Sequence, residues 1–387
     1  MRSTPSLAKA GAMWLVFVLM SAGAPAWSAE ATKPAEPAKS AETANDVARF
    51  IAGLEPSADS PLAPLARDPM WKQHASALDS AWARLEEARL AKIRAWSAAN
   101  LTQPQPAVLY MFSGPDFLYV DAFFSDRTTY VMSGLEPIGQ IPTIQSAPRG
   151  SLGSALGGLR ASVGTALNYS FFITAHMKGS LAATRLNGVL PVLYLFLARS
   201  GKTIQDVTLL GVDKDGAVVP AGTKDATPGV KVTFVGREGK VQTLYYFQTD
   251  LSDSGVKRSG FLKFCAQFEK ADVFIKSASY LLHSGNFSAV RAFLIERAAA
   301  VVQDDSGIPV RHFTAQDWQL RPFGRYLGPI GVFPGMYQKG LSDVFRRSNP
   351  PRLEFGVGYR WRPQESNLLL AVRSAREGVA QETADRK

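Results

Sequence analysis

The apolar positions between residues 71 and 96 recur in steps of three and four, which is the spacing of one face of an α-helix. The pattern predicts a long amphipathic helix near the N-terminus. Its apolar face carries three tryptophans and is typical of a helix that packs against a core. The positions are Trp71, Ala75, Leu78, Trp82, Leu85, Ile93 and Trp96.

Short apolar runs that end in turn residues predict β-strands. Val108–Phe112 is such a run, a short helical segment follows at Phe117–Phe124, and Thr129–Met132 is a second run. This order favours a βαβ unit with two parallel strands, and the short crossover leaves an antiparallel pair as the alternative. An antiparallel meander is predicted further along the chain, at Val207–Val212, Val230–Val235 and Val241–Thr249.

Three other segments have a recognisable pattern. Asn187–Ala198 is continuously apolar and is interpreted as a buried strand. Gly260–Pro309 has regular helical spacing and is interpreted as a helix-rich run. Leu353–Trp361 alternates apolar with other residues, which is the period-two pattern of a half-buried strand. The sequence after Asn367 is interpreted as a helix that ends in a charged tail.

These elements predict an α/β (or α+β) fold, in which a mixed β-sheet is flanked by helices and a long amphipathic helix lies near the N-terminus. Residues 1–28 are predicted to be a signal peptide and residues 29–46 a flexible tether rich in Ala, Pro, Glu and Lys. A single globular α/β domain is predicted over residues 47–365, with a potential subdivision near 180–187. Residues 366–387 form the predicted charged tail.

The first residues predict export. Arg2 and Lys9 precede an apolar run over Ala10–Ala24, and small residues follow it, as in a cleavable signal peptide. The alternative is an uncleaved anchor; with cleavage, no transmembrane span is expected afterwards. The single cysteine, Cys265, excludes an intrachain disulfide. These features favour a periplasmic or secreted bacterial protein.

The basic charge is concentrated in one region. The chain carries a formal charge of +10, and nine basic residues but three acids lie between Arg311 and Arg362. In an exported protein such a region favours an anionic envelope component or a membrane surface as partner, and the compartment argues against nucleic acid. The residues chosen as an anion-binding surface are Arg321, Arg325, Arg346 and Arg347.

Several familiar motifs are absent. Ser200–Thr203 resembles the end of a phosphate-binding loop, but Phe196 stands where that motif requires its first glycine. The four histidines share no metal-ligand spacing, and Ser113 and Ser133 lack the flanking glycines of a nucleophile elbow. No metal or other cofactor is therefore predicted.

The remaining candidates follow from position. If the first two strands are parallel, Ser113, Asp116 and Glu136 come from one edge of the sheet, where ligands of α/β proteins gather. Asp250 follows a third strand. These four residues are candidate ligand-binding groups, and each is also an ordinary turn former.

A second set of candidates lies in the helix-rich run. Lys276, Tyr280 and His283 are predicted to project from one helical face and to act as acids, bases or donors. Asp304 and Asp305 are predicted to follow a helix C-terminus, where negative charge is unfavourable, so a cation is expected nearby. Arg311 is the nearest candidate for that cation. The predicted ligand-binding set therefore consists of Ser113, Asp116, Glu136, Asp250, Asp304, Asp305 and Arg311.

Four segments together resemble a family of uncharacterised bacterial proteins that are predicted to be secreted: Phe112–Phe117, Ser133–Pro137, Lys276–His283 and Gln303–Pro309. The resemblance covers roughly residues 108–361. It implies an envelope location and no particular reaction.

Two functions stay open from the sequence. The preferred hypothesis is a non-catalytic envelope protein that binds an anionic or polar ligand or an envelope partner. The alternative is a periplasmic hydrolase whose carboxylates, Asp116, Glu136, Asp304 and Asp305, are assisted by Lys276, Tyr280 or His283. Convergence of these groups in one cleft would favour the enzyme.

Overall fold

The computed structural model describes residues 41–125, 127–145, 149–172 and 186–374, and the contacts group Ser40–Lys387 into one compact unit. The strands are β1 (Ala107–Tyr110), β2 (Thr129–Gly134), β3 (Thr203–Val212), β4 (Val218–Pro220), β5 (Thr227–Val235), β6 (Val241–Gln248), β7 (Ala271–Ile275), β8 (Ala298–Gln303), β9 (Trp318–Gly324) and β10 (Asn367–Arg373). The longer helices are α1 (Ala44–Ile51), α2 (Pro69–Leu85), α3 (Ala91–Asn100), α4 (Phe117–Phe123), α5 (Arg149–Tyr169), α7 (Leu190–Arg199), α8 (Asp253–Arg258), α9 (Phe261–Cys265), α10 (Ser288–Arg297) and α11 (Lys339–Ser348).

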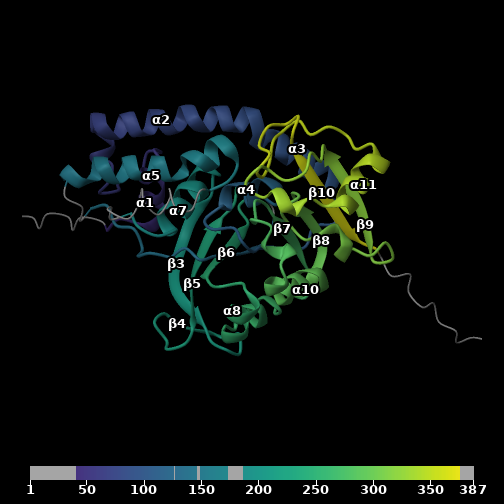
Figure 1. Ribbon diagram of the computed structural model, residues 1–387. Coiled ribbons are helices and arrows are strands. Elements are labelled where there is room, and N and C mark those ends of the chain that lie inside the picture. The colour runs from purple at the N-terminus through teal and green to yellow at the C-terminus, as the bar shows by residue number, and fades with distance from the viewer. Residues whose placement is uncertain (1–40, 126, 146–148, 173–185, 375–387) are drawn as a thin grey trace, which may run out of the picture. The chain divides into compact units, whose positions relative to one another are not determined.

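A mixed sheet of ten strands lies at the centre of this unit, in the order β4-β3-β5-β6-β2-β1-β7-β8-β10-β9 (Figure 1). The five central strands, β6, β2, β1, β7 and β8, are parallel to one another. Antiparallel strands extend the sheet at both ends. The predicted α/β class, with a mixed sheet between helices, is therefore confirmed.

Helices cover both faces of the sheet because successive strand residues point to opposite sides. Val108 and Tyr110 of β1 belong to a core that also contains side chains of α1 to α5 and of α7, whereas Leu109 belongs to a second core with side chains of α8, α9 and α10. Figure 1 shows α2 and α5 on one side of the sheet, and α8 and α10 on the other. A turn of π-helix at Glu86–Leu90 connects α2 to α3 without a break.

The chain leaves β1 and β7 in opposite directions. From β1 it passes through α4 to β2, while from β7, on the other side of β1, it passes through α10 to β8. Parallel crossovers have a fixed hand, so opposite directions place α4 and α10 on opposite faces of the sheet. The carboxyl ends of β1 and β7 therefore flank a crevice at a topological switch point.

The predicted βαβ unit and the meander are both observed. β1 pairs with β2 in parallel across α4, which settles the alternative that was open. β3, β5 and β6 pair antiparallel in sequence order.

Asn187–Ala198, predicted as a strand, contains the helix α7 instead. Every residue from Leu190 to Ala198 is buried, so the helix has no polar face and no helical period appears in its sequence. Pro191 lies in its first turn, where a missing backbone N–H costs least.

Gly260–Pro309 is not mainly helical. It contains two short helices, α9 and α10, and two buried strands, β7 and β8. Both strands are short, apolar and buried, so their sequence cannot be distinguished from a buried helix by periodicity. Lys276, Tyr280 and His283 therefore do not share a helical face, and Asp304 and Asp305 follow a strand.

The end of the chain also differs from its prediction. Leu353–Trp361 forms no strand, since Gly358 has a φ of 72° and Val357 pairs with Arg360 across a turn. Leu353 and Phe355 nevertheless pack in the core, which explains their apolar alternation. The segment from Asn367, predicted as a helix and tail, is the strand β10 between β8 and β9.

A chain that ends after Ser366 should lose cooperative folding, because β10 connects β8 to β9 and buries Leu368, Leu369 and Leu370. Burial of three leucines contributes about 5 kcal/mol or more, which is comparable to the total stability of a domain. Circular dichroism during thermal unfolding would measure the loss. A chain that ends after Ser374 is the reference, and equal transitions in the two chains would contradict this role of β10.

Candidate functional site

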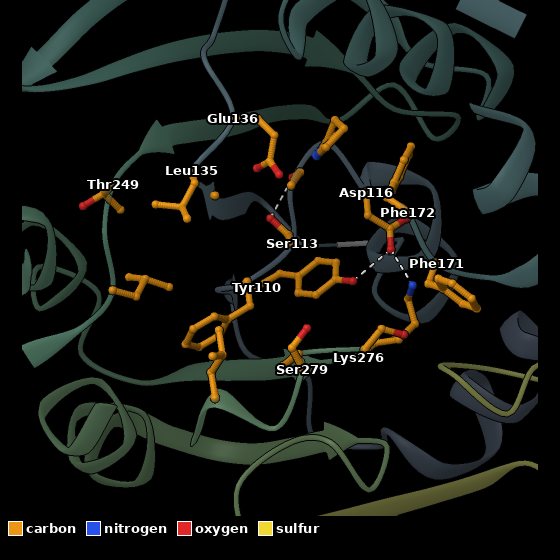
Figure 2. Close-up of a pocket in the computed structure, with 18 of the residues that line it drawn as sticks. Tyr110, Ser113, Asp116, Leu135, Glu136, Phe171, Phe172, Thr249, Lys276 and Ser279 are labelled. Atoms are coloured by element: carbon orange, nitrogen blue, oxygen red, sulfur yellow. Dashed lines mark hydrogen bonds and ion pairs between the residues drawn. The ribbon is translucent and has the colours of Figure 1, made fainter. Parts of the chain in front are cut away.

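A cavity of about 410 Å³ lies at the carboxyl ends of the central strands, at the β1/β7 switch point (Figure 2). Segments that follow β1, β2, β6 and β7 supply most of its wall, and the segment after α5 closes another side. Of the predicted ligand-binding set, Ser113, Asp116, Glu136 and Asp250 all line it. Lys276, Ser277 and Ser279, which follow β7, and Thr249, which follows β6, are further polar residues of the wall.

A buried ion pair joins the two strands of the switch point. Lys276 Nζ lies 2.7 Å from Asp116 Oδ2, and both side chains are almost fully buried. Tyr110 donates its hydroxyl hydrogen to the same oxygen at 2.8 Å, and the backbone N–H of Tyr119 donates to the other oxygen at 3.3 Å. Figure 2 shows Tyr110 and Lys276 meeting at Asp116.

The contacts of this pair oppose the cost of burying its charges. Burial raises the pKa of Asp116, and the ammonium of Lys276 opposes that shift. Lys276 also donates to the carbonyl of Ser170 and lies 4.5 Å from the centre of the Tyr119 ring. Asp116 is thus coordinated on both oxygens, and Lys276 is a fixed cation whose charge is already balanced.

The Glu136 carboxylate lies on another part of the wall. Glu136 is buried, and a Cβ atom at Gly134 would collide with the Oε2 atom of Glu136. The Tyr246 hydroxyl donates to the Glu136 carbonyl at 3.0 Å, and burial together with the Glu136 charge raises the pKa of Tyr246. Glu136 is therefore a carboxylate held close to the backbone after β2.

Backbone strain concentrates around the cavity. Seven described residues other than glycine have a positive φ, and five of them line the cavity or adjoin its wall. Such conformations cost about 1 kcal/mol or more each and cluster at functional sites. The five are Phe112, Ser170, Ser277, Ser279 and Tyr280.

Three serines line the cavity, and two of them, Ser113 and Ser277, differ in their availability. Ser113 donates to the carbonyls of Gly114 and Ser133 and accepts from the Ser133 N–H, so its hydroxyl is fully used. The Ser277 hydroxyl has no partner among the described residues, although its oxygen is buried. Ser277 is therefore an unpaired hydroxyl that would have to rotate toward the cavity before it could contact a ligand.

Asp304 and Asp305 lie behind this wall and do not line the cavity. Asp304 accepts from the Ser277 N–H at 2.9 Å and from both the N–H and the hydroxyl of Ser306. Asp305 accepts from the Tyr280 hydroxyl at 2.7 Å and from the Asn367 amide at 3.2 Å. The two acids thus hold the strained segment Ser277–Tyr280 in place.

Arg311 is not the cation that the sequence argument required. It is exposed, and within the described ranges no ion pair connects it to either acid. The expected conflict with a helix C-terminus does not arise, because Asp304 follows β8. Asp305 is stabilised by Tyr280 and Asn367, with Arg360 as the cation that lowers its pKa against the effect of burial.

The remaining predicted residues lie outside the cavity wall. Tyr280 bonds to Asp305, and His283 packs against the Tyr280 ring at 5.1 Å. Burial lowers the pKa of His283 to about 4, so the imidazole is neutral at pH 7. The four arginines chosen as an anion-binding surface are exposed on β9, after β9 and at the end of α11.

Sequence reasoning missed the aromatic part of the wall and Ser277. Phe171 and Phe172 follow α5, Phe287 precedes α10, and Tyr359 lies in the turn that was predicted as a strand. No sequence spacing relates these residues, since they meet only through the fold. Ser277 had a local signal, because it directly follows Lys276, the first residue after β7.

Within the described ranges, no group of three His, Cys, Asp or Glu side chains could hold a metal ion. The same residues include no helix with the length and apolar character that a membrane span requires.

Lys276→Met should destabilise the protein by about 3–5 kcal/mol, because Asp116 would remain buried without its cation. The double variant Asp116→Asn with Lys276→Met should recover part of this loss, since it leaves no unpaired charge. Urea denaturation of both single variants and the double variant measures the coupling. Simple addition of the two single losses would contradict a coupled pair.

Asp304 should make stability fall as pH rises from about 4 to about 6. Burial first, and then the charge of Asp305, raises its pKa from 3.8 to about 6. The folded protein therefore binds this proton more tightly than the unfolded chain, and ionisation above pH 6 costs up to about 3 kcal/mol. Urea denaturation across this range should give a flatter pH profile for Asp304→Asn.

The control for this experiment is Glu87→Gln. Glu87 is exposed in the π-helical turn between α2 and α3, and it is far from Asp304 in the sequence. Its pH profile should match that of the unmodified protein. An unchanged slope in Asp304→Asn would show that Asp304 is not the group that titrates.

The chain matches no protein-family model, no curated protein and no solved structure in comparisons with each. The resemblance to predicted secreted bacterial proteins therefore stays a prediction that rests on four short segments of this sequence.

Proposed function

We propose that the switch-point cavity binds a small polar ligand that carries a cationic group such as an amine. The charge on the wall carries this proposal. Among the described lining residues, Asp250 is paired with Arg258 at 3.8 Å and Lys276 with Asp116, whereas Glu136 forms no ion pair. Glu136 therefore gives the wall a negative charge that a ligand cation would balance.

The aromatic side chains support the same ligand class. Aromatic rings attract cations through their negative faces, and rings combined with carboxylates are a common means of recognising ammonium groups. The volume of about 410 Å³ suits a small molecule. The rings on the wall belong to Tyr110, Phe112, Phe171, Phe172, Phe287 and Tyr359.

One fixed group, Lys276, would orient the polar remainder of the ligand, and the Ser277 hydroxyl lies next to it in the chain. Lys276 is held by Asp116 and the Ser170 carbonyl, so it presents a positioned ammonium rather than a mobile one. The Ser277 hydroxyl is buried and has no partner in the described structure, so it could bind the ligand after a rotation toward the cavity. Groups that are fixed before binding lose little entropy when the ligand arrives.

An anionic ligand is less favourable in this cavity, because it would face Glu136 and Asp250. The predicted interaction with an anionic envelope component belongs instead to the exposed arginines, which lie elsewhere on the protein. The proposed export of the protein rests on residues 1–28, which lie outside the described residues.

Hydrolysis has less support than binding. Of the seven proposed catalytic residues, only Asp116, Glu136 and Lys276 line the cavity. Asp116 has both oxygens occupied by donors, so it is not free to exchange a proton with a substrate. Glu136 alone remains as a candidate base, and general acid–base catalysis of hydrolysis usually requires a second group.

Thermal unfolding with choline, ethanolamine and lysine as probes tests the proposal. At least one of these cations should raise the melting temperature of the protein. Glu136→Gln keeps the size of the side chain and removes its charge, so it should weaken binding of that probe by about tenfold or more. Glu87→Gln is the matched control and should bind as the unmodified protein does.

Glucose and acetate, a neutral and an anionic probe, complete the panel. Stabilisation by either of them without any effect of the cations would overturn the proposal. So would a cation whose effect is the same in Glu136→Gln, because that cation would bind elsewhere.

A further inference from the structure

A loop between β9 and α11 exposes apolar side chains. Four of the nine large apolar side chains that are exposed in the described structure lie within Leu327–Tyr337, a stretch called here the apolar loop. Val332 is 76% exposed and Tyr337 is 57% exposed, while Leu327 and Met336 are 41% and 38% exposed. Such a concentration differs from the scattered apolar residues of an ordinary surface.

The base of the loop is firmly held, so its exposed residues are not a consequence of loose packing. Arg360 donates to the carbonyls of Gly328 and Pro329 at 2.9 and 3.1 Å. The ring of Phe333, between the exposed residues, packs against Tyr280 at 5.1 Å and Tyr359 at 5.5 Å. The fold thus keeps Val332 and Met336 in solvent on a rigid support.

Basic residues flank the apolar loop. Five of them, and one acid, Asp343, lie within residues 325–352, and all five cations are exposed. α11, whose last turn carries two of these cations, adjoins the base of the loop, because Tyr326 packs against both Phe345 and Tyr337. The cations are Arg325, Lys339, Arg346, Arg347 and Arg352.

We propose that the apolar loop and these cations dock the protein on the surface of an anionic lipid bilayer. Val332, Met336 and Tyr337 would enter the boundary between headgroups and acyl chains, where apolar and aromatic side chains are stable. The flanking cations would contact lipid phosphates, and each contributes to binding in an additive and salt-dependent way. Apolar tips surrounded by positive charge match both components of such a surface.

Docking would also orient the cavity. Phe333 of the apolar loop contacts Tyr359, and Tyr359 lines the cavity wall. The ligand site therefore lies one ring away from the proposed bilayer surface. This interaction is independent of the ligand that the cavity binds, so either proposal can fail without the other.

A fluorescent label at residue 336 tests the docking. Met336→Cys can be labelled with a polarity-sensitive dye in the full chain, because the natural cysteine, Cys265, is buried. With vesicles that contain phosphatidylglycerol, the emission should shift to the blue. Val218→Cys is the matched control, since Val218 is 54% exposed on β4, away from the basic region, and its label should not shift.

Charge reversal separates lipid docking from adhesion through other parts of the chain. Arg346→Glu with Arg347→Glu should weaken the shift at residue 336 by about tenfold or more at low salt. Pure phosphatidylcholine vesicles should give a much smaller shift than the anionic vesicles. The proposal is overturned if labels at 336 and 218 shift equally, if neither shifts, or if only a protein fraction of an envelope extract produces the shift.

Discussion

The ion pair between Asp116 and Lys276 is the interaction on which the site depends. Each residue follows one strand of the switch point, and the fold leads the chain away from these two strands in opposite directions. A crevice between β1 and β7 is therefore unavoidable, and an unpaired charge in it would be costly. The pair neutralises both charges and fixes the two strand ends relative to each other.

A second layer of polar contacts maintains the shape of the wall. Asp304 and Ser306 bind the backbone where the chain leaves β7, and Asp305 binds Tyr280. These contacts stabilise the unusual conformations of Ser277, Ser279 and Tyr280. The two adjacent acids, which first suggest an active site, thus position the wall, and the raised pKa of Asp304 is a consequence of its burial.

The structure separates two kinds of charge that the sequence presents together. The cavity wall carries the carboxylate of Glu136, which forms no ion pair among the described residues, beside aromatic rings, while the exposed basic residues gather around a solvent-exposed apolar loop. A cationic ligand and an anionic surface are therefore compatible partners of one protein. The aromatic contact between Phe333 and Tyr359 connects the two sites.

The sequence by itself determined the elements whose pattern is local. Short apolar runs and turn signals located β1, β2 and the meander. They placed Ser113, Asp116 and Glu136 at one sheet edge only on the condition that β1 and β2 are parallel, and the structure supplied that condition. The sequence could not distinguish α7 from a strand or β7 and β8 from helices, because segments buried on all sides have no polar face and thus no period. Tertiary structure alone paired Lys276 with Asp116, placed Asp304 behind the wall and inserted β10 into the sheet, since these contacts join residues that are far apart along the chain.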